Sequence, residues 1–303
     1  MNNIKGIFLA VLSAAAFGIM PIFAKLSYIY GSNPTSALLF RFLFATIILF
    51  TYFKISNINY KVTLNQFILL FCIGSIGYTT TTQTLFISYN YLDVGLATTL
   101  HYIYPSIVCI LSFFIYREKI SRKKILSLIL SALGVYSLVA FENTSINVLG
   151  TILALISGVS YAINVICFSM KSIKDLDTKV VTLYVSIGAT FGMVIYGMFT
   201  NTITLNFNTQ IFLSYIGLSV VSTIFSIVLL LKAIQLIGSS SASILGTFEA
   251  IISIILGILL LNEKLTFPLI IGSILIVISA ILIAKDKSNS YETHKLAPVN
   301  EIV

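Results

Sequence analysis

Residues 239–264 read SSSASILGTFEAIISIILGILLLNEK. The stretch is long enough to cross a bilayer, which takes about 20 apolar residues. One acid, Glu249, lies near its middle, where a charged side chain is costly and rare. Small residues recur at helical spacing along it, at Ala242, Gly246, Ala250, Ser253 and Gly257. The stretch therefore predicts a membrane helix whose small-residue face packs inward and carries the acid.

The same pattern occurs once before in the chain. Residues 97–119 match 242–264 at an offset of 145 without a gap, and both copies end in Glu-Lys. Residues 6–19 match 150–163 at an offset of 144. The sequence therefore predicts two repeats and a tail, which we place at 1–143, 144–285 and 286–303.

Composition restricts the class of protein. The chain has 303 residues, of which 58% are hydrophobic and 9% charged, with a mean hydropathy of +1.03. A soluble domain is about 25% charged. The apolar runs are continuous, whereas a β-barrel shows short alternating segments. These values exclude an ordinary soluble enzyme and predict an all-α membrane protein.

Run lengths and loop composition predict ten membrane helices. The first run looks like a signal peptide at its start, but it continues through Pro21 to Ala24 and its pattern recurs internally, so we expect a span. The other expected spans are about 36–53, 66–88, 94–116, 124–141, 148–170, 180–200, 211–234, 239–261 and 268–284.

The basic residues indicate the orientation. The net charge is +8, and the loops on the side of the N-terminus hold most Lys and Arg, including the cluster at 117–124. The other side holds only Lys25 and Lys264. This asymmetry predicts both termini in the cytoplasm of a bacterial cell, with the chain in the plasma (inner) membrane. It also explains the positive charge without a nucleic-acid partner.

Five spans in each repeat have a topological consequence. An odd number inserts the second copy upside down relative to the first, so the expected fold is two inverted five-helix repeats. Inverted repeats are typical of secondary transporters, whose substrate sites lie near the middle of the membrane between the halves.

Several motifs together resemble the drug/metabolite transporter superfamily, specifically its EamA-type ten-helix bacterial members. The opening GIFLAVLSAAAFG returns as GTILALISGVSYA, and Arg41 lies in RFLFATIIL. The run GLATTLHYIYPSIVCILSFFIYREKIS is matched by SSASILGTFEAIISIILGILLLNEKLT. The resemblance covers about residues 5–285. It implies a secondary carrier, often an exporter of amino acids or related compounds, whose central cavity opens alternately to each side.

The sequence departs from the family pattern at one place. Family members often carry Glu-Pro in the ninth helix and a Glu at the ends of helices four and nine. Glu118 and Glu263 match the latter feature. The first repeat has Pro105 without the Glu, and the second has Glu249 without the Pro. A kink after Glu249 is therefore in question.

Two charged residues within the expected spans are the main site candidates. Glu249 is either a partner for a proton or a substrate amine, or a structural acid paired with Arg41. Removal from water disfavours its ionised form, so it is a candidate proton carrier. Arg41 either extends to the headgroups, forms a structural ion pair or binds an anionic substrate group.

Other polar side chains in the spans either line a cavity or only join helices. They are Tyr78, Gln83, His101, Tyr102, Tyr161, Asn164 and Tyr184. The second histidine, His294, lies in the tail, so no two-histidine metal site is expected in the membrane. The three cysteines lie in apolar runs and suggest packing rather than metal binding. No cofactor is expected.

The interpretation is a secondary transporter, with export as the expected direction, of a small amphipathic metabolite such as an amino acid. The chain lacks GxxxxGK[ST], HExxH and paired membrane aspartates, which disfavours ATP-driven transport and intramembrane proteolysis. Two alternatives stay open, namely a membrane-embedded enzyme acting on lipid and a scaffold without transport. Proton coupling through Glu249 is a hypothesis, and the sequence leaves open whether the chain forms a homodimer.

Overall fold

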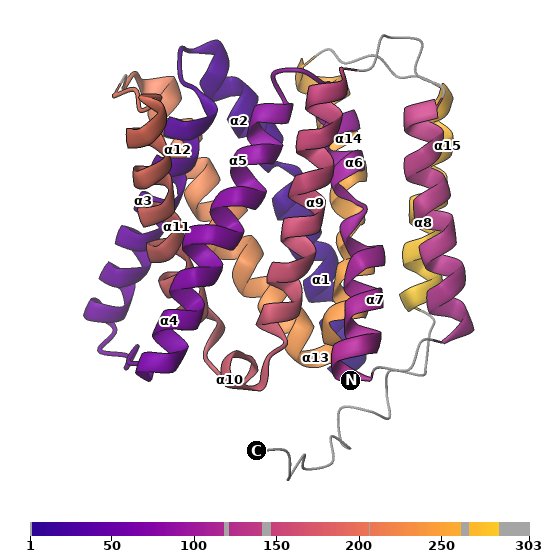
Figure 1. The fold of residues 1–303 in the computed structure, drawn as a ribbon, viewed down its shortest axis with the longest axis horizontal. Helices are drawn as coiled ribbons and strands as arrows, with labels where there is room; N and C mark the ends of the chain where they lie inside the picture. The colour runs from indigo at the N-terminus through magenta and orange to yellow at the C-terminus, as the bar shows by residue number, and fades with distance from the viewer. Residues whose placement is uncertain (1, 118–120, 141–146, 206, 262–266, 285–303) are drawn as a thin grey trace.

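A computed structural model describes residues 2–117, 121–140, 147–205, 207–261 and 267–284. Within these ranges the chain is helical and has no strand. Most helices stand side by side, roughly parallel to one another (Figure 1). The expected tail at 286–303 and the Glu-Lys pairs at Glu118 and Glu263 fall outside the described residues.

The helices of the first half follow one another with short connections. They are α1 (Asn2–Gly18), α2 (Met20–Ile29), α3 (Pro34–Ile55), α4 (Leu64–Cys72), η1 (Ile73–Tyr78), α5 (Thr79–Ser88), α6 (Val94–His101), α7 (Tyr104–Tyr116) and α8 (Arg122–Ala140).

The second half of the chain is also built of helices that follow one another along the sequence. Its helices are α9 (Val148–Phe168), α10 (Lys171–Lys174), α11 (Thr178–Thr200), α12 (Thr209–Ser219), η2 (Val220–Phe225), α13 (Ser226–Gly246), α14 (Phe248–Leu261) and α15 (Phe267–Ala284).

Among the residues that the structure describes, five helical stretches are long and apolar enough to cross a membrane by length and composition. They are Asn3–Ile29, Pro34–Ile55, Val148–Phe168, Thr178–Thr200 and Thr209–Leu261. The last stretch combines two expected spans, which the backbone separates at Gly238, where φ is 79°. Glycine adopts this left-handed conformation without the steric cost that a side chain brings.

Three expected spans are not continuous helices, which corrects the sequence prediction. The first is divided between α1, which ends at Gly18, and α2, which begins at Met20. The span at 94–116 breaks between α6 and α7, where Pro105 stands in the first turn of α7 and has no N–H to give to the preceding turn. The span at 239–261 breaks at Thr247, although no proline follows Glu249. The Thr247 hydroxyl donates to the carbonyl oxygen of Ile244 at 2.7 Å, which satisfies a group at the end of α13.

Two further spans contain a π-helical turn. η1 lies within the expected span 66–88 and η2 within 211–234. A threonine hydroxyl donates to a carbonyl oxygen at each turn, from Thr79 to Gly74 at 3.3 Å and from Thr223 to Leu218 at 2.9 Å. Such turns are rare and often mark functional sites. Each half of the chain therefore carries the same local distortion in a corresponding span.

Polar side chains fix where several helices begin. The side chains of Asn33, Asn147, Asp177 and Asn208 each accept a hydrogen bond from a backbone N–H in the first turn that follows. Thr63 forms a capping box with Gln66. These caps satisfy donors that would otherwise lack partners, and they place the helix ends in the loops that the sequence predicts.

Helices from the two halves pack against one another through the centre of the molecule. α1 packs along α13 and α14, α5 along α9, and α3 along α11 and α12, while α8 and α15 pair at one edge (Figure 1). Small residues allow the close approach, since a Cβ atom added at Gly18 would lie 2.6 Å from Cβ of Ile252. The largest buried cluster thus lies between the halves.

Candidate functional site

A small cavity lies between the two halves. Its volume is about 30 Å³, which is room for about one or two water molecules. The space is therefore too small in this structure for a molecule much larger than water. The residues that line the cavity are Phe17, Met20, Arg41, Tyr78, Thr81, Thr82, Leu85, His101, Tyr161 and Glu249.

Arg41 is held on one side of the cavity by the π-helical turn η2. Its side chain is 1% exposed. Nε donates to Oγ1 of Thr223 at 2.6 Å, and one terminal nitrogen donates to the carbonyl oxygen of Ser222 at 2.8 Å. The other terminal nitrogen lies 2.8 Å from Sδ of Met20. All three partners are neutral. They therefore hold the buried guanidinium in place without compensating its positive charge.

Glu249 lies in the first turn of α14, directly after the break at Thr247. Its side chain is 5% exposed. The N-terminus of a helix carries partial positive charge, which attracts a carboxylate. The hydroxyl of Tyr102 interacts with the carboxyl group and also donates to the carbonyl oxygen of Gly246 at 3.3 Å. The break in the helix thus creates the environment of the acid.

Arg41 and Glu249 face the same cavity, but no ion pair joins these two described residues. The geometry therefore does not support a structural ion pair between them. Each charge has its own neutral partners, and both remain available to a molecule placed in the cavity.

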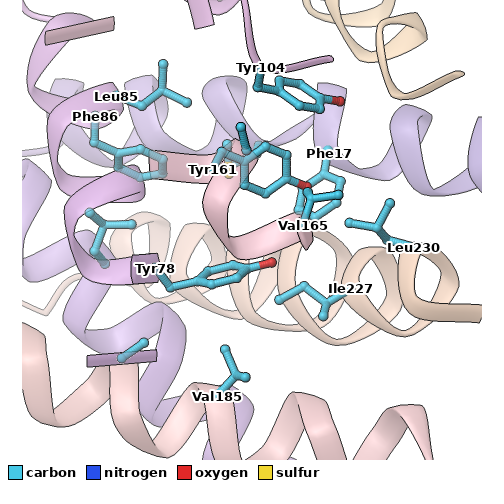
Figure 2. Packing of buried hydrophobic residues seen from close by; sticks show 14 of the residues in the cluster. Phe17, Tyr78, Leu85, Phe86, Tyr104, Tyr161, Val165, Val185, Ile227 and Leu230 are labelled. Atoms are coloured by element: carbon cyan, nitrogen blue, oxygen red, sulfur yellow. The ribbon is translucent and has the colours of Figure 1, made fainter. Parts of the chain in front are cut away.

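Aromatic rings form the wall beside Glu249. The ring centroids of Tyr104 and Tyr161 lie 4.8 Å apart, and the His101 ring lies 5.3 Å from each of them. The three rings come from α6, α7 and α9, and Figure 2 shows Tyr104 and Tyr161 near Phe17. The hydroxyl of Tyr78, which is 1% exposed, has no hydrogen-bond partner among the described residues.

His101 belongs to a hydrogen-bonded chain that links two helices. Its Nδ1 lies 2.8 Å from Oγ of Ser157, and that hydroxyl donates to the carbonyl oxygen of Thr81 at 2.8 Å. The imidazole is 4% exposed. Ser157 thus orients the His101 ring at the cavity wall.

The structure brings together five of the nine residues expected to form a site, and Tyr102 adjoins them through Glu249. Gln83 does not line the cavity, because its amide donates to Oγ1 of Thr35 at 3.0 Å. Tyr184 lies elsewhere and donates to the carbonyl oxygen of Tyr60 at 3.1 Å. Both therefore join helices or loops in this structure.

Asn164 lies between the cavity and a separate lateral groove. Its amide nitrogen donates to Oγ1 of Thr81 at 3.1 Å, and Thr81 lines the cavity. On its other side, Asn164 lines a groove of about 680 Å³ between α4, η1, α5 and α9, together with Gly77 and mainly apolar side chains. Asn164 is thus part of the wall that separates the two spaces.

Several residues of the site have no distinct signal in the sequence. Phe17, Met20 and Leu85 line the cavity but look like ordinary apolar positions. Thr223 and Ser222, which hold Arg41, lie in an apolar run that gives no sign of a π-helical turn. The hydroxyl groups that face Arg41 can be identified only when the packing of α3 against η2 is known.

The contacts among the titratable groups bear on the enzyme alternative. An enzyme acting on lipid would need clustered titratable groups. No hydrogen bond joins any two of Arg41, Glu249 and His101, all of which the structure describes. Within the described ranges, no three His, Cys, Asp or Glu side chains come together as a metal site.

Known proteins are similar to the chain over most of its length. The profile of the EamA-like transporter family matches residues 4–140 and 148–285. The chain is 30% identical over 203 residues to the uncharacterized transporter YvbV of Bacillus subtilis (strain 168), and the alignment spans 65% of each protein. It is 27% identical over 300 residues to the uncharacterized inner membrane transporter YicL of Salmonella typhimurium, spanning 93% of this chain and 96% of that protein.

One solved crystal structure shares the fold. Its TM-score is 0.71 at 13% sequence identity, and the superposition covers 92% of this chain and 96% of that chain. At this identity the likeness concerns the fold alone.

Proposed function

Because the chain belongs to the EamA-like transporter family, we propose that it is a secondary transporter that exports a small amphipathic metabolite across the bacterial plasma membrane. The family and the long apolar helices support a multi-pass membrane transporter, and the family points to a transporter rather than an enzyme. The proposed substrate is an amino acid or a related compound.

One observation carries the choice of substrate. Arg41 and Glu249 present opposite charges to one cavity without forming an ion pair with each other. Buried charges are costly unless they are paired. A zwitterion would pair both, with its carboxylate at Arg41 and its ammonium at Glu249. Arg carries five N–H donors, of which the contacts described above use three, so two remain for a substrate.

We propose that the chain crosses the membrane ten times as two inverted five-helix repeats, with both termini in the cytoplasm. The paired π-helical turns η1 and η2 support the repeat. The breaks after His101 and after Gly246 support it as well, since they lie 145 residues apart in matched stretches. The excess of Lys and Arg on one side supports the orientation.

The size of the cavity supports alternating access. A space of about 30 Å³ does not hold an amino acid, so binding must accompany a movement of the halves that opens the cavity to one side. Rocking of two repeats about a central site achieves this without a continuous pore. Proton coupling through Glu249 fits the same scheme, because a buried carboxyl group can carry a proton in one direction and a substrate amine in the other.

The test is efflux from proteoliposomes loaded with a labelled mixture of amino acids. We expect loss of at least one amino acid faster than from protein-free liposomes. Arg41→Gln and Glu249→Gln should each reduce that efflux to the background rate. Tyr184→Phe, which removes a polar group far from the cavity, is the matched control and should keep it. Transport that both charge variants retain would contradict the proposal.

A further inference from the structure

We propose that Nε2 of His101 accepts a hydrogen bond from an N–H group of the substrate's ammonium. The carrier would therefore accept primary amines and reject their N-trimethylated counterparts. The inference rests on the proposed transport of a zwitterion and specifies which end of the substrate the aromatic wall receives. The hydrogen-bonded chain from His101 through Ser157 to Thr81 carries the argument.

The chain of hydrogen bonds fixes the tautomer of His101. The carbonyl oxygen of Thr81 only accepts, so Ser157 must donate its single hydroxyl proton to it across 2.8 Å. The Ser157 oxygen is then the acceptor for His101, whose Nδ1 lies 2.8 Å away. In the neutral imidazole the proton is therefore on Nδ1, and Nε2 carries the lone pair. Burial without a bonded carboxylate disfavours the charged imidazolium.

The lone pair of Nε2 has no partner in the protein. Within the described part of the chain, the imidazole bonds only to Ser157, and the ring lines the cavity. The buried hydroxyl of Tyr78 on the same cavity wall also lacks a partner. Buried polar groups are nearly always hydrogen-bonded. The unpaired Tyr78 hydroxyl indicates that a polar ligand belongs in the cavity, and the lone pair of Nε2, which accepts no hydrogen bond from the described residues, needs a donor on that ligand.

The surroundings indicate that this donor belongs to a cation. The rings of Tyr104 and Tyr161 flank His101, and Glu249 lines the same cavity. Aromatic faces and a carboxylate attract any ammonium group, including a quaternary one. Only an ammonium with N–H bonds also satisfies Nε2. A site built to bond an N–H rejects an analogue that lacks it, because the buried acceptor is then left unpaired.

The experiment measures binding of matched ligand pairs to the full-length purified protein. The probes are the proteinogenic L-amino acids that have a primary amine and the N-trimethyl betaine of each, assayed by calorimetry in detergent. For the amino acid that binds most tightly, we expect its betaine to bind about tenfold more weakly or worse. Equal binding of the two would overturn the inference.

Two substitutions separate substrate recognition from packing. His101→Gln places an amide near the position of Nε2 and should keep most of the selectivity. His101→Asn places its amide near Nδ1, so it keeps the contact with Ser157 but loses the acceptor. We expect His101→Asn to bring the ratio of the two affinities close to one. An unchanged ratio in His101→Asn would overturn the inference.

Nitrogen NMR gives a readout that is independent of binding strength. The chain has two histidines, so His294→Gln leaves His101 as the single imidazole. Labelled protein should show the Nδ1–H tautomer, and the amino acid should shift the Nε2 resonance whereas the betaine should not. An Nε2–H tautomer would contradict the inference.

The outcomes also separate this inference from the proposed function. If an amino acid binds and depends on Arg41 and Glu249 but its betaine binds equally, the transport proposal stands and the role of His101 fails. If neither amino acids nor betaines bind, the zwitterion proposal fails and this inference fails with it.

Discussion

Arg41 illustrates how single residues define the site. Its side chain is buried and held by a hydroxyl, a carbonyl oxygen and a thioether rather than by an acid. Neutral partners orient the guanidinium without cancelling its charge, so it stays attractive to an anion. Glu249 plays the complementary part on α14.

The support that Thr223 gives to Arg41 can be measured. Thr223→Val removes the acceptor at 2.6 Å from Nε of Arg41. Hydrogen bonds to charged groups contribute about 1.5–3 kcal/mol, so KM for the substrate should rise about tenfold or more. Thr182→Val is the matched control, because this buried hydroxyl donates only within its own helix, to Thr178. Equal effects of both variants would contradict a specific role for Thr223.

The second prediction at the residue scale concerns pH. Flux in proteoliposomes should depend on an imposed pH gradient, because Glu249 is proposed to carry the proton. Glu249→Gln keeps the shape of the side chain but cannot titrate, so the background flux that it leaves should not respond to the gradient. Measuring flux with and without the gradient in both proteins tests this. A mutant that responds to the gradient as the wild type does would rule out Glu249 as the coupling group.

At the scale of elements, the site depends on places where helices are irregular. The turn η2 presents Ser222 and Thr223 to Arg41, and the break before α14 places Glu249 at a helix N-terminus. The turn η1 provides Tyr78. A set of regular helices with the same sequence would therefore not build this cavity.

Gly77 in η1 gives a prediction about packing. A Cβ atom added there would collide with Oδ1 of Asn164. Gly77→Ala should therefore displace Asn164, break its bond to Thr81 and destabilise the protein by about 1–3 kcal/mol. The double variant with Asn164→Ala removes the colliding group, so it should melt at a higher temperature than Gly77→Ala alone. Additive losses would show that Asn164 is not the obstacle.

At the scale of the whole molecule, the two halves are interleaved rather than placed side by side. α1 contacts α13 and α14, and α5 contacts α9. A cavity formed between interleaved halves changes shape when either half moves, which suits a carrier. It also means that the orientation of one half in the membrane determines that of the other.

The proposed orientation can be tested in intact cells. In a background without the native cysteines, Ile58→Cys and Leu205→Cys place single thiols in exposed segments on the two sides assigned from loop charge. A membrane-impermeant maleimide should label only the cysteine at 205 in intact cells and both in broken cells. Labelling of the cysteine at 58 in intact cells would reverse the assignment.

The sequence predicts much of the architecture because apolar run length and repeat spacing are local properties. Arg41 and Glu249 stand out because charge is rare within spans, and both reach the cavity. Tyr184 looks equally suitable in sequence, yet it bonds to Tyr60, since the face that a tyrosine occupies depends on neighbouring helices. The π-helical turns cannot be recognised from the hydrophobic periodicity of the sequence, because each turn adds only a single residue to a long apolar run.

That single inserted residue gives η2 a further consequence. Each residue of a helix advances the next by about 100° around the axis. Deleting one residue from Val220–Phe225 would leave a regular α-helix whose flanking faces are unchanged. If the segment instead kept all its residues and wound as a regular α-helix, everything after it would be rotated by about that angle. The side chains of α13 that now pack against α1 would then be turned away from it. The one extra residue in η2 thus sets how α13 is rotated about its axis. It lies far from the helix ends, where insertions are normally tolerated.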